Sequence, residues 1–172
     1  MRFPMLCELC CKDYNVGDVL ITKSRHIFVC KECQSFVLIN GIRVQGGFMV
    51  VPVKYQSLEK AIKEHIYVRP WVRKTRHQAF IAFYHKGAIF YIGKIKRIDV
   101  KVPREKIEHM LQLDERWGKK DFYIVYEMQY VDMLKKPILK DKCPTIQSKV
   151  LVPFKKFVSA KNICDFFKRN RS

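Results

Sequence analysis

Acidic residues are scarce in this sequence, and several kinds of catalytic motif are absent. The 172 residues include 16 Asp and Glu against 34 Lys and Arg, and residues 65 to 98 contain no acid. A metal-dependent nuclease needs clustered carboxylates to hold magnesium, so this composition disfavours that class. There is also no Gly-rich phosphate loop, no HExxH helix and no Ser-His-Asp order. These absences favour a non-catalytic protein without deciding the question.

Long apolar runs are missing as well. No stretch reaches the roughly 20 residues that cross a bilayer, and the first seven residues hold no run typical of a signal peptide. We therefore expect a cytoplasmic protein with no membrane partner. In a reducing cytoplasm, paired cysteines are more often metal ligands than disulfides. Hydrophobic residues make up 48 % of the chain, which is enough for a core.

Positive charge is abundant and unevenly distributed. Residues 1 to 45 carry six basic and four acidic side chains, a net charge of +2, which four thiolates and one zinc ion would bring to zero. Residues 46 to 172 carry 28 basic and 12 acidic side chains, a net charge of +16. Such an excess attracts polyanions, and nucleic acid is the commonest of them. A basic surface that serves only solubility is the alternative explanation.

Four cysteines form two knuckles near the start of the chain. The pairs are Cys7–Cys10 and Cys30–Cys33, each with a two-residue spacer, and 19 residues separate them. Each spacer lets a tight turn point both sulfurs at one metal, and four thiolates in a tetrahedron suit zinc. Strand-like sequence between the knuckles predicts a hairpin that brings them together. We predict one structural zinc ion in a ribbon.

The other three cysteines do not fit this site. Cys11 follows Cys10 directly, so its side chain is expected to point away from the metal. Cys143 and Cys164 are isolated in the sequence, and Cys164 lies on the apolar face of a predicted helix. A free cysteine at such a position usually behaves as a small hydrophobic residue.

The remainder of the chain alternates strands with short helices. Gly46–Gly47 predicts a turn between strands. Ser57, Pro103 and Ser159 mark the starts of three short helices, at about residues 57, 103 and 159. The expected strands cover residues 36–39, 42–44, 48–51, 66–68, 79–84, 88–98, 122–126 and 150–154.

The strand that begins at Ala88 changes parity along its length. Ile95 has an odd number, whereas Ile98, Val100 and Val102 have even numbers, so in a regular strand they would point to opposite faces. One extra residue near Lys96 and Arg97, a β-bulge, would return all of these side chains to a single apolar face. Bulges bend strands, as small barrels require.

Two stretches resemble the PUA-like barrels. Residues 80–87 and 92–98 (FIAFYHKG and IGKIKRI) are similar to a pattern of the EVE domain, a relative of the YTH and ASCH domains. Residues 123–130 and 134–138 are similar to a later strand and Pro-Ile stretch of the same domains. The resemblance spans roughly residues 78 to 140. It implies a small curved barrel that binds RNA or DNA, in some members by gripping a modified base in an aromatic pocket.

Basic and aromatic side chains alternate in residues 66 to 104, which contain ten Lys or Arg and one acid. Basic groups neutralise phosphates and flat rings stack on bases, so this composition suits a single strand or a flipped base. The alternative is that the rings are core and the charges a solvated face. The candidate binding residues are Arg69, Trp71, Arg73, Lys74, Arg76, His77, Tyr84, Tyr91, Lys94, Lys96 and Arg97.

The sequence thus predicts an α+β protein with two parts. Residues 1–45 are expected to form the zinc ribbon, and residues 46–172 a small, basic, curved β-barrel of the PUA or EVE kind with about three short helices. The expected function is non-catalytic binding of DNA or RNA, with the ribbon as a further contact surface for proteins. Two alternatives remain open: a protein-docking adaptor of a larger nucleic-acid complex, and a metal-dependent nuclease.

Overall fold

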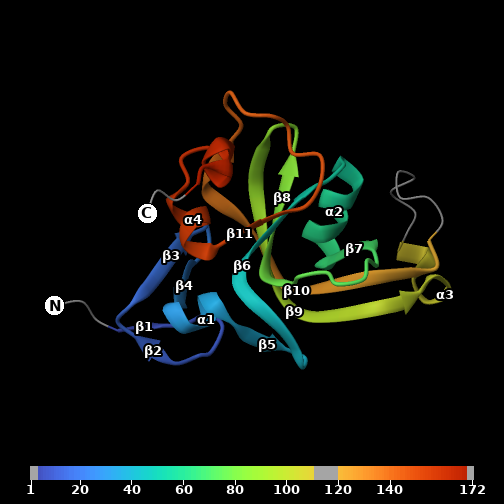
Figure 1. Cartoon of the computed structure of the whole chain (residues 1–172), viewed down its shortest axis with the longest axis horizontal. Helices are drawn as coiled ribbons and strands as arrows, with labels where there is room; N and C mark the ends of the chain where they lie inside the picture. The colour runs from blue at the N-terminus through green and yellow to red at the C-terminus, as the bar shows by residue number, and fades with distance from the viewer. Residues whose placement is uncertain (1–3, 111–119, 170–172) are drawn as a thin grey trace.

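One curled sheet carries most of the chain (Figure 1). The computed structural model describes residues 4–110 and 120–169, and these form an α+β fold whose sheet bends into half of a barrel. Seven strands make the sheet, in the spatial order β11-β6-β8-β9-β10-β7, with β5 paired to β6. They are β5 (Val37–Ile39), β6 (Ile42–Pro52), β7 (Ile66–Pro70), β8 (Gln78–His85), β9 (Ala88–Pro103), β10 (Phe122–Leu139) and β11 (Val150–Val152). The expected fold class is confirmed in this coarse form.

Helix α2 (Tyr55–Glu64) and strand β7 both lie in the connection between the two parallel strands of the sheet. β6 and β8 pair in parallel, whereas every other neighbouring pair is antiparallel. The helix buries Leu58 and Ala61 and packs against β7 and β10. It begins two residues before the expected N-cap at Ser57, because Lys54 occupies the N-cap position.

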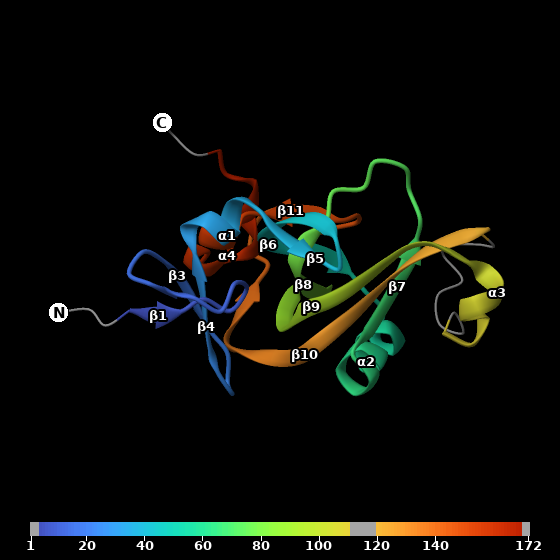
Figure 2. The same cartoon turned by 90° about the horizontal axis from the view of Figure 1, so that it is seen from below.

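Strands β9 and β10 form a long twisted pair that extends beyond the rest of the sheet (Figure 2). The register skips Lys96, since Arg97 pairs with Glu127 and Ile95 pairs with Met128. The expected bulge is therefore confirmed at this residue, and it buries both Ile95 and Ile98. Val100 is exposed, and the register shifts again between Asp99 and Val102, so one bulge does not place all of these side chains on one face.

Gly46 and Gly47 lie inside β6, and the turn expected there is wrong. A Cβ atom on Gly46 would lie 2.2 Å from the carbonyl oxygen of Cys33, and one on Gly47 would lie 2.7 Å from that of Val152. The two glycines let the strand pass close to its neighbours on both sides. Close backbone approach, not a reversal of the chain, accounts for this pair.

The N-terminal segment folds as short strands and one short helix beside the sheet (Figure 1). β3 and β4 pair as an antiparallel hairpin, which confirms the hairpin expected between the cysteine knuckles. β1 pairs with β2 in a second small sheet. These elements are β1 (Met5–Leu6), β2 (Asp13–Tyr14), β3 (Gly17–Ile21), β4 (His26–Cys30) and α1 (Lys31–Ser35).

The remaining helices are short. The helix expected after Pro103 is present, as α3 (Arg104–Ile107) followed by the 3-10 turn η1 (Glu108–Met110). Ser159 ends α4 (Phe154–Ser159) instead of starting a helix, because Pro153 sets the start of that helix six residues earlier. Asn162 caps the next element, the 3-10 helix η3 (Ile163–Phe167). Within the described residues, every helix is too short to cross a membrane.

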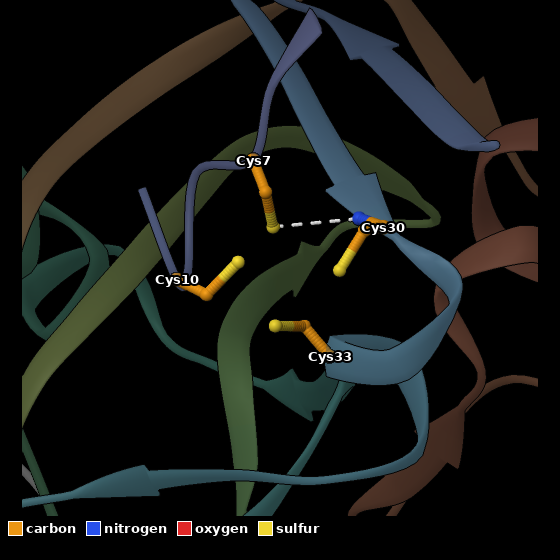
Figure 3. Close-up of side chains that lie close together, drawn as sticks. All are labelled: Cys7, Cys10, Cys30 and Cys33. Carbon is orange, nitrogen blue, oxygen red and sulfur yellow. Dashed lines mark hydrogen bonds between the residues drawn. The ribbon is translucent and has the colours of Figure 1, made fainter. Parts of the chain in front are cut away.

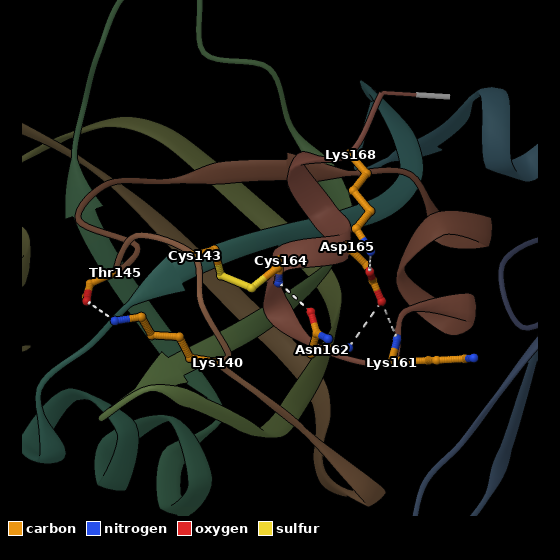
Figure 4. Close-up of a disulfide and its surroundings, with 8 residues drawn as sticks. All are labelled: Lys140, Cys143, Thr145, Lys161, Asn162, Cys164, Asp165 and Lys168. Atoms are coloured by element: carbon orange, nitrogen blue, oxygen red, sulfur yellow. Dashed lines mark hydrogen bonds and ion pairs between the residues drawn. A yellow bond between two sulfur atoms is a disulfide. The ribbon is translucent and has the colours of Figure 1, made fainter. Parts of the chain in front are cut away.

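A disulfide joins Cys143 and Cys164, so the expectation that these cysteines are free is wrong (Figure 4). Cys143 lies in the segment between β10 and β11, and Cys164 lies in η3, with 5.3 Å between the two Cα atoms. The side chain of Asn162 accepts a hydrogen bond from the backbone N–H of Cys164 and fixes that turn. The disulfide ties the C-terminal helices to the loop that leads into β11.

A continuous core runs from the cysteine knuckles to the C-terminal helices. Cys7, Cys30 and Cys33 belong to the same apolar cluster as Phe48 and Phe157. Strand β6 itself runs across residue 45, where the ribbon was expected to end. Whether residues 1–45 and 46–172 fold independently stays a prediction, which the metal-removal experiment in the Discussion tests.

Candidate functional site

Four cysteine side chains point toward one another at the junction of the ribbon and the sheet (Figure 3). Their sulfur atoms all lie within 4.8 Å of one another. A tetrahedral zinc ion with Zn–S bonds of about 2.3 Å holds its sulfurs about 3.8 Å apart. The four sulfurs are therefore close enough to hold one metal ion together. The residues are those expected from the sequence: Cys7, Cys10, Cys30 and Cys33.

Each knuckle is built by a tight local turn. In the first, the backbone N–H of Cys11 donates to the carbonyl of Cys7 at 2.9 Å, and that of Cys7 donates to Lys12 at 2.8 Å. In the second, Cys30 ends β4 and Cys33 follows one turn later in α1. Cys11 has a φ of 59° and is exposed outside the cluster, so the expectation that it points away is confirmed.

The surroundings shift the pKa values of the thiols in different directions. Burial raises the pKa of Cys7, but backbone N–H donors around its sulfur, first that of Cys30 at 3.4 Å, outweigh burial and lower the pKa to about 7. Burial, together with the neighbouring thiols, raises the pKa of Cys33. A bound cation would remove this mutual repulsion, because metal ligands bind as thiolates. Among residues 4–110 and 120–169, no other group of three or more Cys, His, Asp or Glu side chains is close enough to hold a metal.

Glu8 anchors the first knuckle to the sheet. Its carboxylate accepts a hydrogen bond from the Tyr130 hydroxyl at 3.1 Å and pairs with Lys94 at 3.4 Å. The Lys94 ammonium also donates to the Glu8 backbone carbonyl at 2.7 Å. Because Glu8 lies between Cys7 and Cys10, these contacts hold the cysteine cluster in place against strands β9 and β10.

The three basic candidates on β9 are each paired with an acid. Besides Lys94, Lys96 pairs with Glu127 at 3.1 Å, and Arg97 pairs with Asp99 at 3.0 Å. Their charges are locally neutralised. These residues contribute less to a positive surface than the sequence suggested.

The basic residues around the β7–β8 loop form a different group. The loop stands clear of the sheet, in green in Figure 2. Within the part of the chain that the structure describes, no ion pair involves any of them. Three are exposed and two partly buried, and together we call them the basic loop: Arg69, Arg73, Lys74, Arg76 and His77.

The aromatic candidates divide in the same way. Tyr84 is 3 % exposed, so its ring is core and offers no face to a ligand, contrary to the expectation. Tyr91 on β9 is partly buried. Trp71 lies at the start of the basic loop, partly buried, and meets the exposed ring of Phe122 edge-on at 6.3 Å.

The comparisons with known proteins add no relative. No family model, no curated protein and no solved structure matches this chain. The curled half-barrel sheet agrees with the resemblance to PUA-like barrels in overall shape only. What the site does must therefore be argued from its geometry.

Sequence reasoning missed two residues beside Trp71. The Lys101 ammonium lies over the rings of both Trp71 (5.3 Å to the ring centroid) and Phe122 (5.1 Å). Both neighbours come from the extended β9–β10 pair, and only the pairing of those strands brings them to the loop. A spacing pattern within residues 66–104 could not reveal Phe122. The sequence offers a second tryptophan beside lysines, Trp117, as a competing candidate for base stacking, and it lies outside the described residues.

Proposed function

We propose that this chain binds nucleic acid without catalysing a reaction, and that the basic loop with Trp71 is its contact surface. One observation carries the proposal. The basic loop combines unpaired positive charge with an adjacent, partly open aromatic pair, Trp71 and Phe122. Arginine and lysine neutralise phosphates, and rings stack on unpaired bases, so a single strand or a flipped base fits this surface. A PUA- or EVE-like barrel is consistent with this role.

We further propose that the four cysteines hold one zinc ion with a structural role. An all-thiolate, largely buried tetrahedral set is typical of closed structural zinc sites, which leave no position for substrate. The segment around it has a net charge that zinc tetrathiolate would bring to zero, so it attracts phosphates weakly. The ribbon then orients the basic barrel instead of supplying the main nucleic-acid contacts.

Binding to nucleic acid should depend steeply on salt. If about three to five phosphates are neutralised on a single strand, affinity should fall about 20- to 100-fold between 50 and 200 mM salt. Fluorescence anisotropy with single- and double-stranded DNA and RNA at several salt concentrations measures this slope. The same panel, extended to modified bases, identifies the preferred class of ligand.

A pair of double variants with the same net charge provides the control. Arg73→Gln with Arg76→Gln removes two charges of the basic loop and should flatten the log–log salt slope by about 1.4. Lys96→Gln with Arg97→Gln removes two charges that are paired with acids, and should change the slope little. Equal effects of the two double variants would show that net charge alone drives binding.

Trp71→Ala should weaken binding to single strands by about 1–3 kcal/mol, because a stacked base loses its platform. The ring is only partly buried, so the loss of stability should stay below the roughly 3–5 kcal/mol of a buried aromatic residue. Anisotropy and thermal melting on the same variant separate the two effects. Phe90→Ala is the control, because it removes an exposed ring of β9 outside the proposed surface. A large drop in melting temperature with unchanged affinity would remove Trp71 from the binding surface.

The alternatives predict other outcomes. An adaptor would bind no nucleic acid even at low salt. A magnesium-dependent nuclease would cleave the strands of the panel. Asp99 is the one acid in residues 66–104, so cleavage that survives Asp99→Ala would contradict both the binding role and a nuclease site built on Asp99.

A further inference from the structure

Three positively charged or protonatable side chains meet at the open mouth of the half-barrel. Arg69 comes from the edge strand β7, His77 from the residue before β8, and Lys149 from the residue before the opposite edge strand β11. The Arg69 guanidinium reaches β6, where its Nη1 lies 3.6 Å from the sulfur of Met49. Met49 pairs with Leu151, which lies on the same side of its strand as Lys149, two residues earlier. A hydrogen bond of 3.3 Å joins His77 Nδ1 to the hydroxyl of Tyr126, in the wall of the barrel.

No acid balances this group within the described ranges. None of the three side chains takes part in an ion pair there, and all three are partly buried. Burial lowers the pKa of His77, and Lys149 and Arg69 lower it further. Burial, followed by the charge of Arg69, also lowers the pKa of Lys149. Like charges held together with reduced solvation destabilise the fold, and a bound anion would relieve that repulsion.

His77, though neither Arg69 nor Lys149, lines the first of two adjoining polar cavities. One of about 370 Å³ is lined by Ser35, Arg43, Val44, Gln45, Thr75, Arg76 and His77. A second, of about 250 Å³, shares Gln45 and Arg76 with the first and includes the buried amide of Gln78. Neither cavity is lined by an acid, and two further arginines flank the approach to His77. The mouth of a curved barrel is also a common place for a ligand site.

We propose that Arg69, His77 and Lys149 form a phosphate-binding site at the mouth of the half-barrel. The guanidinium offers a planar fork of donors, the ammonium offers a compact charge, and the imidazole offers one further N–H. Donors from three strands and loops surround a tetrahedral anion better than a planar one. The assignment to a phosphate of nucleic acid rests on the proposed function. Free inorganic phosphate has the same chemistry, and the experiment separates the two sources.

Inorganic phosphate is the probe for the site itself. Thermal melting of the whole protein is measured in sodium phosphate and in sodium chloride at matched ionic strength. At a phosphate concentration about ten times the dissociation constant, the melting temperature should rise by about 3–6 °C. Lys149→Gln should lose this rise, whereas Lys142→Gln, an exposed lysine of the same segment, should keep it. An equal rise in both variants, or none in the unmodified protein, overturns the site.

A second readout reports on the site directly. The His77 ring signals, followed by NMR during a pH titration, should show a higher pKa with phosphate than with chloride, because a bound anion favours the charged imidazole. Lys149→Gln should also weaken single-strand binding about 5- to 50-fold if the phosphate belongs to nucleic acid. Lys149-dependent melting and His77 shifts without any nucleic-acid binding would leave the site standing and reject the proposed function. The opposite result is nucleic-acid binding that Lys149→Gln does not change, with no effect of phosphate on melting. It would reject the phosphate site and leave the proposed function standing.

Discussion

Cys33→Ser should abolish metal binding and lower the melting temperature of the whole chain. Cys33 is buried and supplies one of four converging sulfurs, and a serine hydroxyl does not replace a thiolate at such a site. Zinc binding to small structural sites contributes about 10–16 kcal/mol of apparent free energy at neutral pH. Elemental analysis of protein purified without added metal should fall from about one zinc per chain to near zero.

Cys11→Ser is the matched control, because Cys11 adjoins a ligand but lies exposed outside the cluster. It should leave both metal content and melting unchanged. Unmodified protein that carries no metal and has all four thiols freely titratable would contradict the metal site.

Chelation of the unmodified protein tests the two-part organisation. Hydrogen exchange should show loss of protection first in residues 4–45, since the metal holds the two knuckles together. Strands β8 and β9 should keep their protection, because Phe80 and Ile92 are fully buried at the centre of the sheet. Simultaneous loss in both parts would show that Glu8, Gly46 and the shared core make the chain a single cooperative unit.

Phe48→Ala should be the most damaging substitution away from the metal. The ring is fully buried and stacks on Phe157, Phe80 and Phe154, with centroid distances of 3.7, 5.1 and 5.7 Å. These contacts join β6 to β8 and to α4. Truncation of such a residue costs about 3–5 kcal/mol, which corresponds to about 6–20 °C in melting temperature for a chain of this size.

Phe90→Ala controls for the loss of an aromatic ring, because Phe90 is 43 % exposed. Its effect on melting should be a small fraction of that of Phe48→Ala. Comparable losses from the two variants would mean that the stack of phenylalanines does not organise the core.

The parts of the structure that depend on local spacing could be predicted from the sequence. The two-residue spacers fix the cysteine knuckles, and the change of parity around Lys96 reveals the bulge. Features that depend on distant approach could not be predicted. Gly46 has the composition of a turn, and only the nearby backbone of Cys33 explains it as strand.

The binding surface shows the same limit. All residues of β8 from Gln78 to Tyr84 are buried, on both faces of the strand. The sequence pattern alone could not tell that the Tyr84 ring lies in the core. Lys149 is 72 residues away from His77 in the sequence, and the curl of the sheet alone places it at the mouth of the half-barrel. Charge pairing across strands, as between Lys96 and Glu127, likewise needs the register.

The disulfide between Cys143 and Cys164 sets an order of assembly. One chain needs four cysteines reduced for metal and two oxidised for a cross-link, and a free thiolate attacks a disulfide through a mixed intermediate. Metal that is already bound withdraws four of the seven cysteines from this exchange. A chain loaded before oxidation thus leaves three thiols, Cys11, Cys143 and Cys164, and only three pairings are open to them. A chain oxidised first is exposed to scrambling.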